Sequence, residues 1–164
     1  MKKISIIFVL IILASLLFVR FPFTVNKTLE GICWAEEDYF MEPVTIQING
    51  TFYRSILRNN LFKGQFLFDG ISAEDQLMDI TFQHDGLDYA TISYFRPTEN
   101  RIIVIGDLLI EGAFNKLLFT ISASTLDRNY PTDKVCFSAP ATDLQTAKAL
   151  AKSLNEQLEK HFSS

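Results

Sequence analysis

The chain has 164 residues, enough for one domain of ordinary size in addition to a short apolar segment. Its net charge of −4 leaves no basic stripe of the kind that binds phosphate backbones, so we expect no nucleic-acid partner. Its two cysteines and two histidines lack the spacing of a zinc site, and no phosphate-binding glycine loop is present. We therefore predict no metal site and no cofactor.

Residues 4–19 form an apolar run that follows two lysines and ends before an arginine. The run is longer than the core of most cleaved signals (roughly 7–15 residues) and slightly shorter than a spanning helix (about 20 residues). No pair of small residues for cleavage follows it. We predict a retained signal anchor over residues 1–23, with Phe21 and Phe23 at the lipid headgroups.

This anchor predicts a single-pass protein of the cell membrane, with a cytoplasmic N-terminus and the C-terminal domain outside. The membrane is then the first expected partner, contacted through residues 4–19. The alternative is a protein secreted after signal cleavage.

Residues 24–42 mix polar and apolar side chains and include the acidic run Glu36-Glu37-Asp38. We predict a solvated membrane-proximal linker in this range. The extracytoplasmic domain is then expected to span residues 43–164.

From residue 43 the chain becomes a series of short runs with apolar residues at every second position, separated by turn residues. The first run, residues 44–48, ends at Asn49-Gly50, a strong hairpin signal, so we predict a turn there. Gly106 lies inside an apolar run and predicts a bulge or a tight bend. The eight strands are predicted at residues 44–48, 51–58, 62–68, 78–82, 90–94, 101–110, 117–121 and 135–138.

Residues 142–162 have the clearest helical pattern. Thr142 and Gln145 resemble a capping box. Apolar residues then recur at steps of three and four and form one stripe: Leu144, Ala147, Leu150, Leu154, Leu158 and Phe162. The sequence thus predicts an α+β domain: an antiparallel β meander of about eight strands, as an open sheet or a barrel, with one C-terminal amphipathic helix packed on it.

The predicted strands are rich in phenylalanine, of which the chain has 15. One interpretation is an aromatic core. The other is a pocket for an apolar ligand, because eight strands close into a barrel that is either filled or holds one small ligand. The candidate lining residues are Phe62, Phe66, Phe68, Phe82 and Phe119.

Cys33 and Cys136 flank most of the predicted domain. Compartments outside the cytosol permit oxidation, so a disulfide between them is one hypothesis. The alternative is two separate buried thiols, because free cysteine is commonly buried.

No arrangement of residues predicts catalysis. The chain has no Gly-x-Ser-x-Gly motif, and His84 is interpreted as a polar residue at a strand end. We therefore expect no catalytic residues and no enzyme. The first hypothesis is a membrane-anchored, non-catalytic interaction or structural module with a protein partner in or at the membrane. The alternative is a binding module for an apolar or lipid-like small ligand.

Four arginines fall near predicted strand ends: Arg54, Arg58, Arg96 and Arg101. They either cluster to bind an anion or act as edge charges that discourage strand pairing between molecules.

Overall fold

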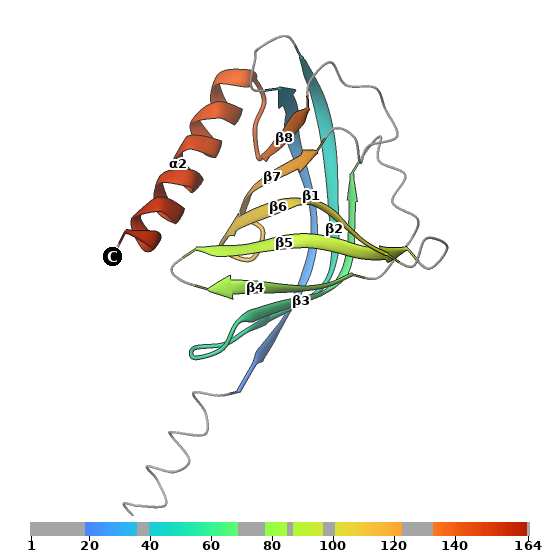
Figure 1. Cartoon of the computed structure of the whole chain (residues 1–164), viewed down its shortest axis with the longest axis vertical. Helices are drawn as coiled ribbons and strands as arrows, with labels where there is room; N and C mark the ends of the chain where they lie inside the picture. The colour runs from blue at the N-terminus through green and yellow to red at the C-terminus, as the bar shows by residue number, and fades with distance from the viewer. Residues whose placement is uncertain are drawn as a thin grey trace, which may run out of the picture.

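The computed structural model describes residues 19–35, 40–68, 78–84, 87–96, 101–122 and 133–163. These residues form a closed barrel of eight antiparallel strands in sequence order, with a helix packed on its outer face (Figure 1). The elements are β1 Phe21–Ala35, β2 Met41–Arg54, β3 Asn60–Phe68, β4 Met78–His84, β5 Asp88–Arg96, β6 Arg101–Glu111, β7 Lys116–Ser122, β8 Lys134–Ala139 and α2 Leu144–Phe162. The predicted antiparallel meander with a C-terminal helix is confirmed, and the meander closes into a barrel.

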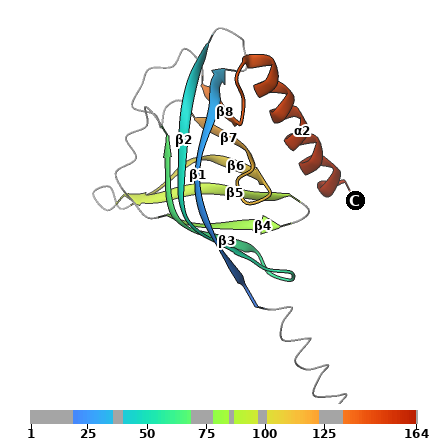
Figure 2. The same ribbon diagram turned by 180° about the vertical axis from the view of Figure 1, so that it is seen from behind.

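Strand β1 occupies most of the range predicted as a linker, so the linker prediction for residues 24–42 is wrong. β1 pairs with β2 from Phe21↔Arg54 to Trp34↔Met41, and the two strands form a long curved ribbon (Figure 2). The inner face of β1 carries buried Val25, but the lysine two residues later interrupts the apolar alternation. The acidic run at residues 36–38 lies outside the described residues.

Strand β2 runs unbroken through Asn49-Gly50, so the predicted turn at that position is also wrong. Gly50 lies directly opposite Gly64 of β3. A Cβ atom at Gly50 would lie 2.3 Å from the Lys63 carbonyl oxygen and 2.7 Å from the Gly64 Cα. Glycine is needed here for close backbone approach. Two predicted strands therefore merge into β2, and the unpredicted β1 restores the number to eight.

Gly106 marks the predicted bulge. The β5–β6 register shifts between Ile92 and Ser93, where Ile92 pairs with Gly106 and Ser93 pairs with Val104. A Cβ atom at Gly106 would lie 2.0 Å from the Thr120 carbonyl oxygen of β7. The bulge prediction is confirmed, and the same glycine allows β7 to pack closely.

The barrel interior is filled by apolar side chains from all eight strands. The largest interior side chains are phenylalanines with at most 2% exposure. Phe114 comes from the loop between β6 and β7, and the others come from strands: Phe52, Phe62, Phe66, Phe82, Phe119 and Phe137. Their rings pack in tilted and edge-to-face pairs, the geometries that aromatic quadrupoles favour.

A second apolar cluster lies outside the barrel, beneath α2. Helix residues Ala147, Ala151 and Leu154 are buried there against the outer faces of β1, β6, β7 and β8. The Trp34 Nε1 donates to the Ser138 Oγ at 3.0 Å inside this layer. The predicted amphipathic helix packed on the sheet is therefore confirmed.

The N-cap of α2 is Asp143, one residue after the predicted Thr142. Its side chain accepts a hydrogen bond from the Thr146 backbone N–H at 2.8 Å. Hydrogen bonds from Thr146 hold the pKa of the Asp143 carboxyl below its ordinary value, because they favour the charged form.

The two cysteines, both in the described part of the chain, form no disulfide bond. Cys33 pairs in register with Phe137, and Cys136 pairs with Trp34, so the thiols are on adjacent strands at positions one residue apart. Successive residues of a strand face opposite sides of the sheet. Cys33 belongs to the interior cluster and Cys136 packs against the cluster beneath α2. The disulfide prediction is therefore not supported.

Of the predicted anchor over residues 1–23, the structure describes only the residues from Val19 on. β1 begins at Phe21, so the last three residues of that range are strand and the anchor prediction is wrong for them. Within the described part of the chain, no helix has both the length and the hydropathy needed to cross a membrane.

Candidate binding site at the barrel mouth

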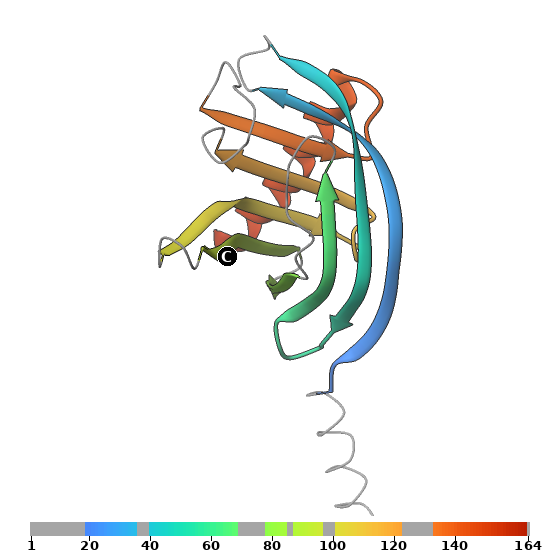
Figure 3. The same cartoon turned by 90° about the vertical axis from the view of Figure 1, so that its right-hand side faces the viewer.

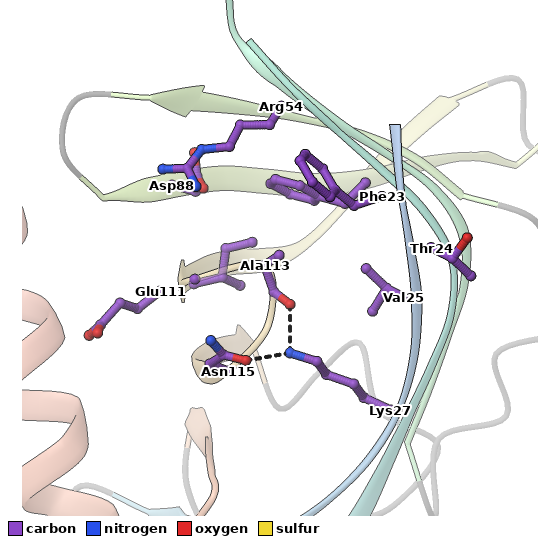
Figure 4. Close-up of a pocket in the computed structure, with 12 residues that line it drawn as sticks. Phe23, Thr24, Val25, Lys27, Arg54, Asp88, Glu111, Ala113 and Asn115 are labelled. Atoms are coloured by element: carbon purple, nitrogen blue, oxygen red, sulfur yellow. Dashed lines mark hydrogen bonds between the residues drawn. The ribbon is translucent and has the colours of Figure 1, made fainter. Parts of the chain in front are cut away.

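One end of the barrel has an opening because β1 extends past β8. β1 pairs with β8 only over residues 32–35, and the Glu30 carbonyl oxygen accepts a hydrogen bond from the Ala141 N–H just after β8. The first part of β1 is paired with β2 alone among the described strands. A pocket of about 390 Å³ lies at this end, between β1 and the β6–β7 loop (Figure 4). We call it the mouth pocket. Its lining residues are Phe23, Thr24, Val25, Lys27, Phe52, Arg54, Asp88, Ile110, Glu111, Gly112, Ala113 and Asn115.

The β6–β7 loop, residues 112–115, folds back into the barrel. Gly112, Ala113 and Phe114 have φ values of +62°, +51° and +65°. The left-handed region costs a residue with a side chain roughly 1–2 kcal/mol. The Asn115 N–H donates to the Glu111 carbonyl oxygen at 3.0 Å and closes the turn. The loop is thus held in a conformation that two of its residues disfavour.

This conformation places Phe114 in the barrel interior, where the side chain is fully buried. Its ring centroid lies 5.0 Å from that of Phe62, 5.8 Å from that of Phe66 and 5.9 Å from that of Phe82. The Phe52 ring, which also lines the mouth pocket, lies 6.0 Å away. Phe114 therefore packs at the centre of the aromatic interior, and Phe52 connects it to the mouth pocket.

Lys27 spans the opening from β1 to this loop (Figure 4). Its Nζ donates to the Ala113 carbonyl oxygen at 2.9 Å and to the Asn115 Oδ1 at 2.5 Å. Both acceptors are neutral, and no ion pair joins Lys27 to a carboxylate among the described residues. Partial burial lowers the pKa of the Lys27 ammonium, because desolvation disfavours the charged form.

The two carboxylates of the mouth pocket each have a partner. Asp88 is buried at the start of β5, where its Oδ1 accepts from the Asn60 Nδ2 at 2.6 Å. Glu111 forms an ion pair with Lys116 at 2.9 Å. Arg54 reaches across the pocket toward Asp88 (Figure 4). Lys27 is therefore the cation of this pocket whose hydrogen-bond partners, among the described residues, are both neutral.

Asn60 connects Asp88 to the β2–β3 turn. The fully buried Asn60 accepts from the Ser55 N–H through its Oδ1 at 2.8 Å, and the Ser55 Oγ accepts from the Arg58 N–H at 3.2 Å. This chain of hydrogen bonds positions the turn at the edge of the mouth pocket.

The sequence-predicted phenylalanines lie deeper than this pocket. Phe62, Phe66, Phe82 and Phe119 all point into the barrel and belong to the interior cluster, and three of them contact Phe114. The backbone of Phe68 is in β3, and its side chain lies outside the described part. None of these residues lines the mouth pocket.

The four arginines do not form one cluster. Arg54 ends β2 at the mouth, and Arg58 lies in the adjoining turn. Arg96 and Arg101 pair in register at the opposite end of the barrel.

His84 ends β4 opposite Asp88, with its side chain outside the description. Within the described ranges, no three His, Cys, Asp or Glu side chains are grouped to hold a metal ion.

Sequence reasoning missed Lys27, Asn60 and Phe114. Lys27 occupies an inward position of β1, which becomes informative only once residues 21–35 are recognised as a strand. Phe114 gave a usable signal, because an aromatic residue in a short loop between two apolar runs is unusual for a solvated turn.

Comparisons of the chain with protein-family models, with curated proteins and with solved structures find no match. Function is therefore inferred from the geometry of the site.

Proposed function

We propose that this domain binds a small amphipathic ligand with an apolar tail and an anionic head in the mouth pocket. The observation that carries the proposal is the position of the Lys27 ammonium. It lies in a pocket with aromatic and aliphatic walls and has only neutral partners among the described residues. The proposal narrows the apolar or lipid-like ligand expected from the sequence, and moves its site from the interior to the mouth.

The apolar part of the pocket suits the tail. Phe23, Val25, Phe52 and Ile110 line it, and Phe23 is 50% exposed at its edge. A volume of about 390 Å³ lies within the range of small-molecule sites. Covering these surfaces with a hydrocarbon chain would contribute about 25 cal/mol for each Å² of apolar area buried.

The polar part suits the head. A carboxylate or similar anion at Lys27 would replace the neutral Ala113 carbonyl and Asn115 amide with an acceptor of opposite charge, so the hydrogen bond from the ammonium would gain the Coulomb attraction of an ion pair. The anion would also compensate the desolvation that lowers the pKa of Lys27. Affinity would then fall as the pH rises through that lowered pKa, below the pH at which an ordinary lysine loses its proton.

The loop provides a route for the tail. A ligand that takes the Lys27 ammonium removes two contacts that hold residues 113 and 115. The loop can then leave its disfavoured backbone conformation, and the tail can occupy the space of the Phe114 ring. Strained backbone of this kind is concentrated at ligand-binding and switch regions.

The proposed setting is the outer face of a cell membrane, with residues 4–19 as the tether and the barrel as a non-catalytic domain. The alternative setting is release after signal cleavage. The apolarity of residues 4–19 supports the tether.

A second candidate function is an interaction or structural module that binds a protein in or at the membrane. The filled interior favours this candidate, because seven phenylalanines occupy the space that many ligand-binding barrels leave open.

The test is calorimetric titration of the full chain in lipid nanodiscs with decanoate and with decanol, after subtraction of the heat from empty nanodiscs. We expect decanoate to bind more tightly than decanol. Lys27→Met should weaken decanoate binding by about tenfold, which corresponds to one charge-assisted hydrogen bond. Decanol binding should not change.

Lys152→Met is the matched control, because Lys152 is exposed on α2 away from the pocket. It should bind decanoate like the wild type. Equal binding of decanoate by empty and loaded nanodiscs would contradict the proposal and leave the protein-interaction module as the better candidate.

A further inference from the structure

Exposed apolar side chains gather at the end of the barrel where β1 begins. Seven large hydrophobic residues are exposed among those that the structure describes, and five belong to this end. They are Val19 at 43%, Phe21 at 42%, Phe23 at 50%, Ile56 at 62% and Leu57 at 56%. The remaining two, Met41 and Val104, lie toward the opposite end.

Two chain segments bring these residues together. Phe21 pairs with Arg54 at the last rung of the β1–β2 ladder, where β1 begins and β2 ends. Figure 3 shows the β2–β3 turn beside the start of β1. Ile56 and Leu57 thus form the tip of a turn next to Val19 and Phe21. We call these four residues the apolar end.

A solvated turn is normally built from polar residues, so two adjacent exposed aliphatic residues at its tip need another explanation. The turn is also rigidly placed. Ser55, just before Ile56, is buried, and the hydrogen bonds of Asn60 and Ser55 define its shape. The apolar tip is therefore a fixed projection of the barrel.

The charges around the apolar end are mainly positive. Arg20, Arg54 and Arg58 are exposed there. The nearby carboxylate of Asp79 is in an ion pair with Lys63 at 2.9 Å. Asp88 is buried beneath the turn, where it accepts from Asn60. An apolar tip with an arginine border is complementary to a layer of hydrocarbon beneath anionic headgroups.

The chain outside the structure also leads to this end. The apolar run of residues 4–19 stops at Val19, which belongs to the apolar end. A bilayer that holds this run would therefore lie next to Ile56 and Leu57. Docking is then intramolecular, and a short connection gives it a high effective concentration.

We propose that the apolar end docks on the lipid bilayer, with Ile56 and Leu57 inserted between the headgroups and with Arg20 and Arg58 against anionic lipid. This inference deepens the proposed membrane setting and rests on the tether, but it does not depend on the ligand. It also orients the barrel, because Phe23 links the apolar end to the mouth pocket. The mouth then opens at the membrane surface, where amphipathic anions are concentrated.

The test is quenching of tryptophan fluorescence in the full chain reconstituted into vesicles of phosphatidylglycerol and phosphatidylcholine with brominated acyl chains. Leu57→Trp places an indole at the apolar end. Val104→Trp is the matched control, because Val104 is 56% exposed near the opposite end. The native Trp34 is common to both variants and is buried under α2.

We expect brominated lipid to remove most of the added fluorescence of the L57W variant and little of that of V104W. Vesicles of phosphatidylcholine alone should reduce the L57W quenching, since the arginines then lose their anionic partners. Equal quenching of the two variants, with the protein still floating with the vesicles, would overturn docking and leave the tether intact.

Failure of the protein to float would overturn the tether and docking together. A blue shift of L57W that depends on protein density but not on bromine would assign the apolar end to a second copy of the chain, and so also overturn docking. Decanoate titration of the L57W variant reports on the ligand site separately, since Leu57 does not line the mouth pocket.

Discussion

Two regions of the barrel are covered in different ways. One is the wall, where α2 packs on the outer faces of four strands, and the other is the mouth, where the β6–β7 loop inserts Phe114. At the wall, α2 lays an apolar stripe on β1, β6, β7 and β8, and small residues such as Ala147 let it approach closely. At the mouth, a loop with two side-chain-bearing residues in the left-handed region inserts one ring and is held by one lysine. The wall has many regular contacts, whereas the mouth depends on Phe114 and Lys27.

This difference in packing indicates which region stabilises the fold and which region could exchange its contacts for those of a ligand. At the wall, the regular packing of α2 on the strands shows no strain that opening would relieve. At the mouth, the loop is strained, its phenylalanine ring is buried and Lys27 has neutral partners. An amphipathic anion could replace these contacts, because it would supply both an apolar surface and a negative charge. The wall therefore serves to stabilise the fold, and the mouth is where we propose that the ligand binds.

The largest expected effect is that of Phe114→Ala, which empties the centre of the barrel. We predict a loss of about 3–5 kcal/mol in the free energy of unfolding, typical of a buried phenylalanine. Decanoate should recover part of this loss, since its tail can fill the space. Chemical denaturation with and without decanoate measures both quantities.

The matched wall variant is Leu154→Ala, which removes a fully buried side chain beneath α2. Its loss should be about 2–5 kcal/mol, and decanoate should restore none of it beyond the increase seen for the wild type. Equal recovery in the two variants would erase the distinction between wall and mouth.

A smaller effect is expected at Ala113, whose φ is +51°. Ala113→Gly removes the left-handed penalty of about 1–2 kcal/mol and adds an unfolded-state entropy cost of about 0.4–1 kcal/mol. We predict a stability equal to or slightly above that of the wild type. Ala149→Gly, on the exposed face of α2, should instead lose about 1 kcal/mol. Destabilisation of both variants alike, measured by thermal melting, would show that the loop is not strained.

The smallest effect is expected at the N-cap of α2. The pKa of Asp143 is lower in the folded chain than in the unfolded chain, so its capping contribution is complete above the ordinary carboxyl pKa of about 4. This contribution is lost as the pH falls through the lowered value. We predict that Asp143→Ala melts below the wild type at neutral pH and that the difference shrinks in acid.

Asp143→Asn provides the control for this titration, because asparagine caps helices without a charge. Its melting temperature should lack the acid-dependent component. An unchanged gap between wild type and D143A across the acid range would contradict the assignment.

Sequence periodicity predicted the wall well. The helical stripe and most strand positions follow from spacing alone, since their inward residues are almost uniformly apolar. Two errors share a physical cause. Lys27 broke the alternation that would have revealed β1, and Gly50 was interpreted as a turn residue although it serves close packing against Gly64. In both cases a tertiary contact overrides the local pattern.

The mouth could not be predicted for the same reason. Lys27 and Ala113 are separated by 86 positions, and only the closed barrel brings them together. The four predicted phenylalanines whose side chains are described are inside the barrel, but no local pattern indicates that a loop residue, Phe114, fills the space among them.

Hydrogen exchange of the full chain with and without decanoate tests the central claim most directly, because it compares the mouth and the wall in one measurement. We predict that decanoate changes exchange at the β6–β7 loop, where the Asn115 N–H is hydrogen-bonded, and leaves the α2 amides unchanged. Binding of decanoate with no change at the loop, or with its main change along α2, would contradict the account.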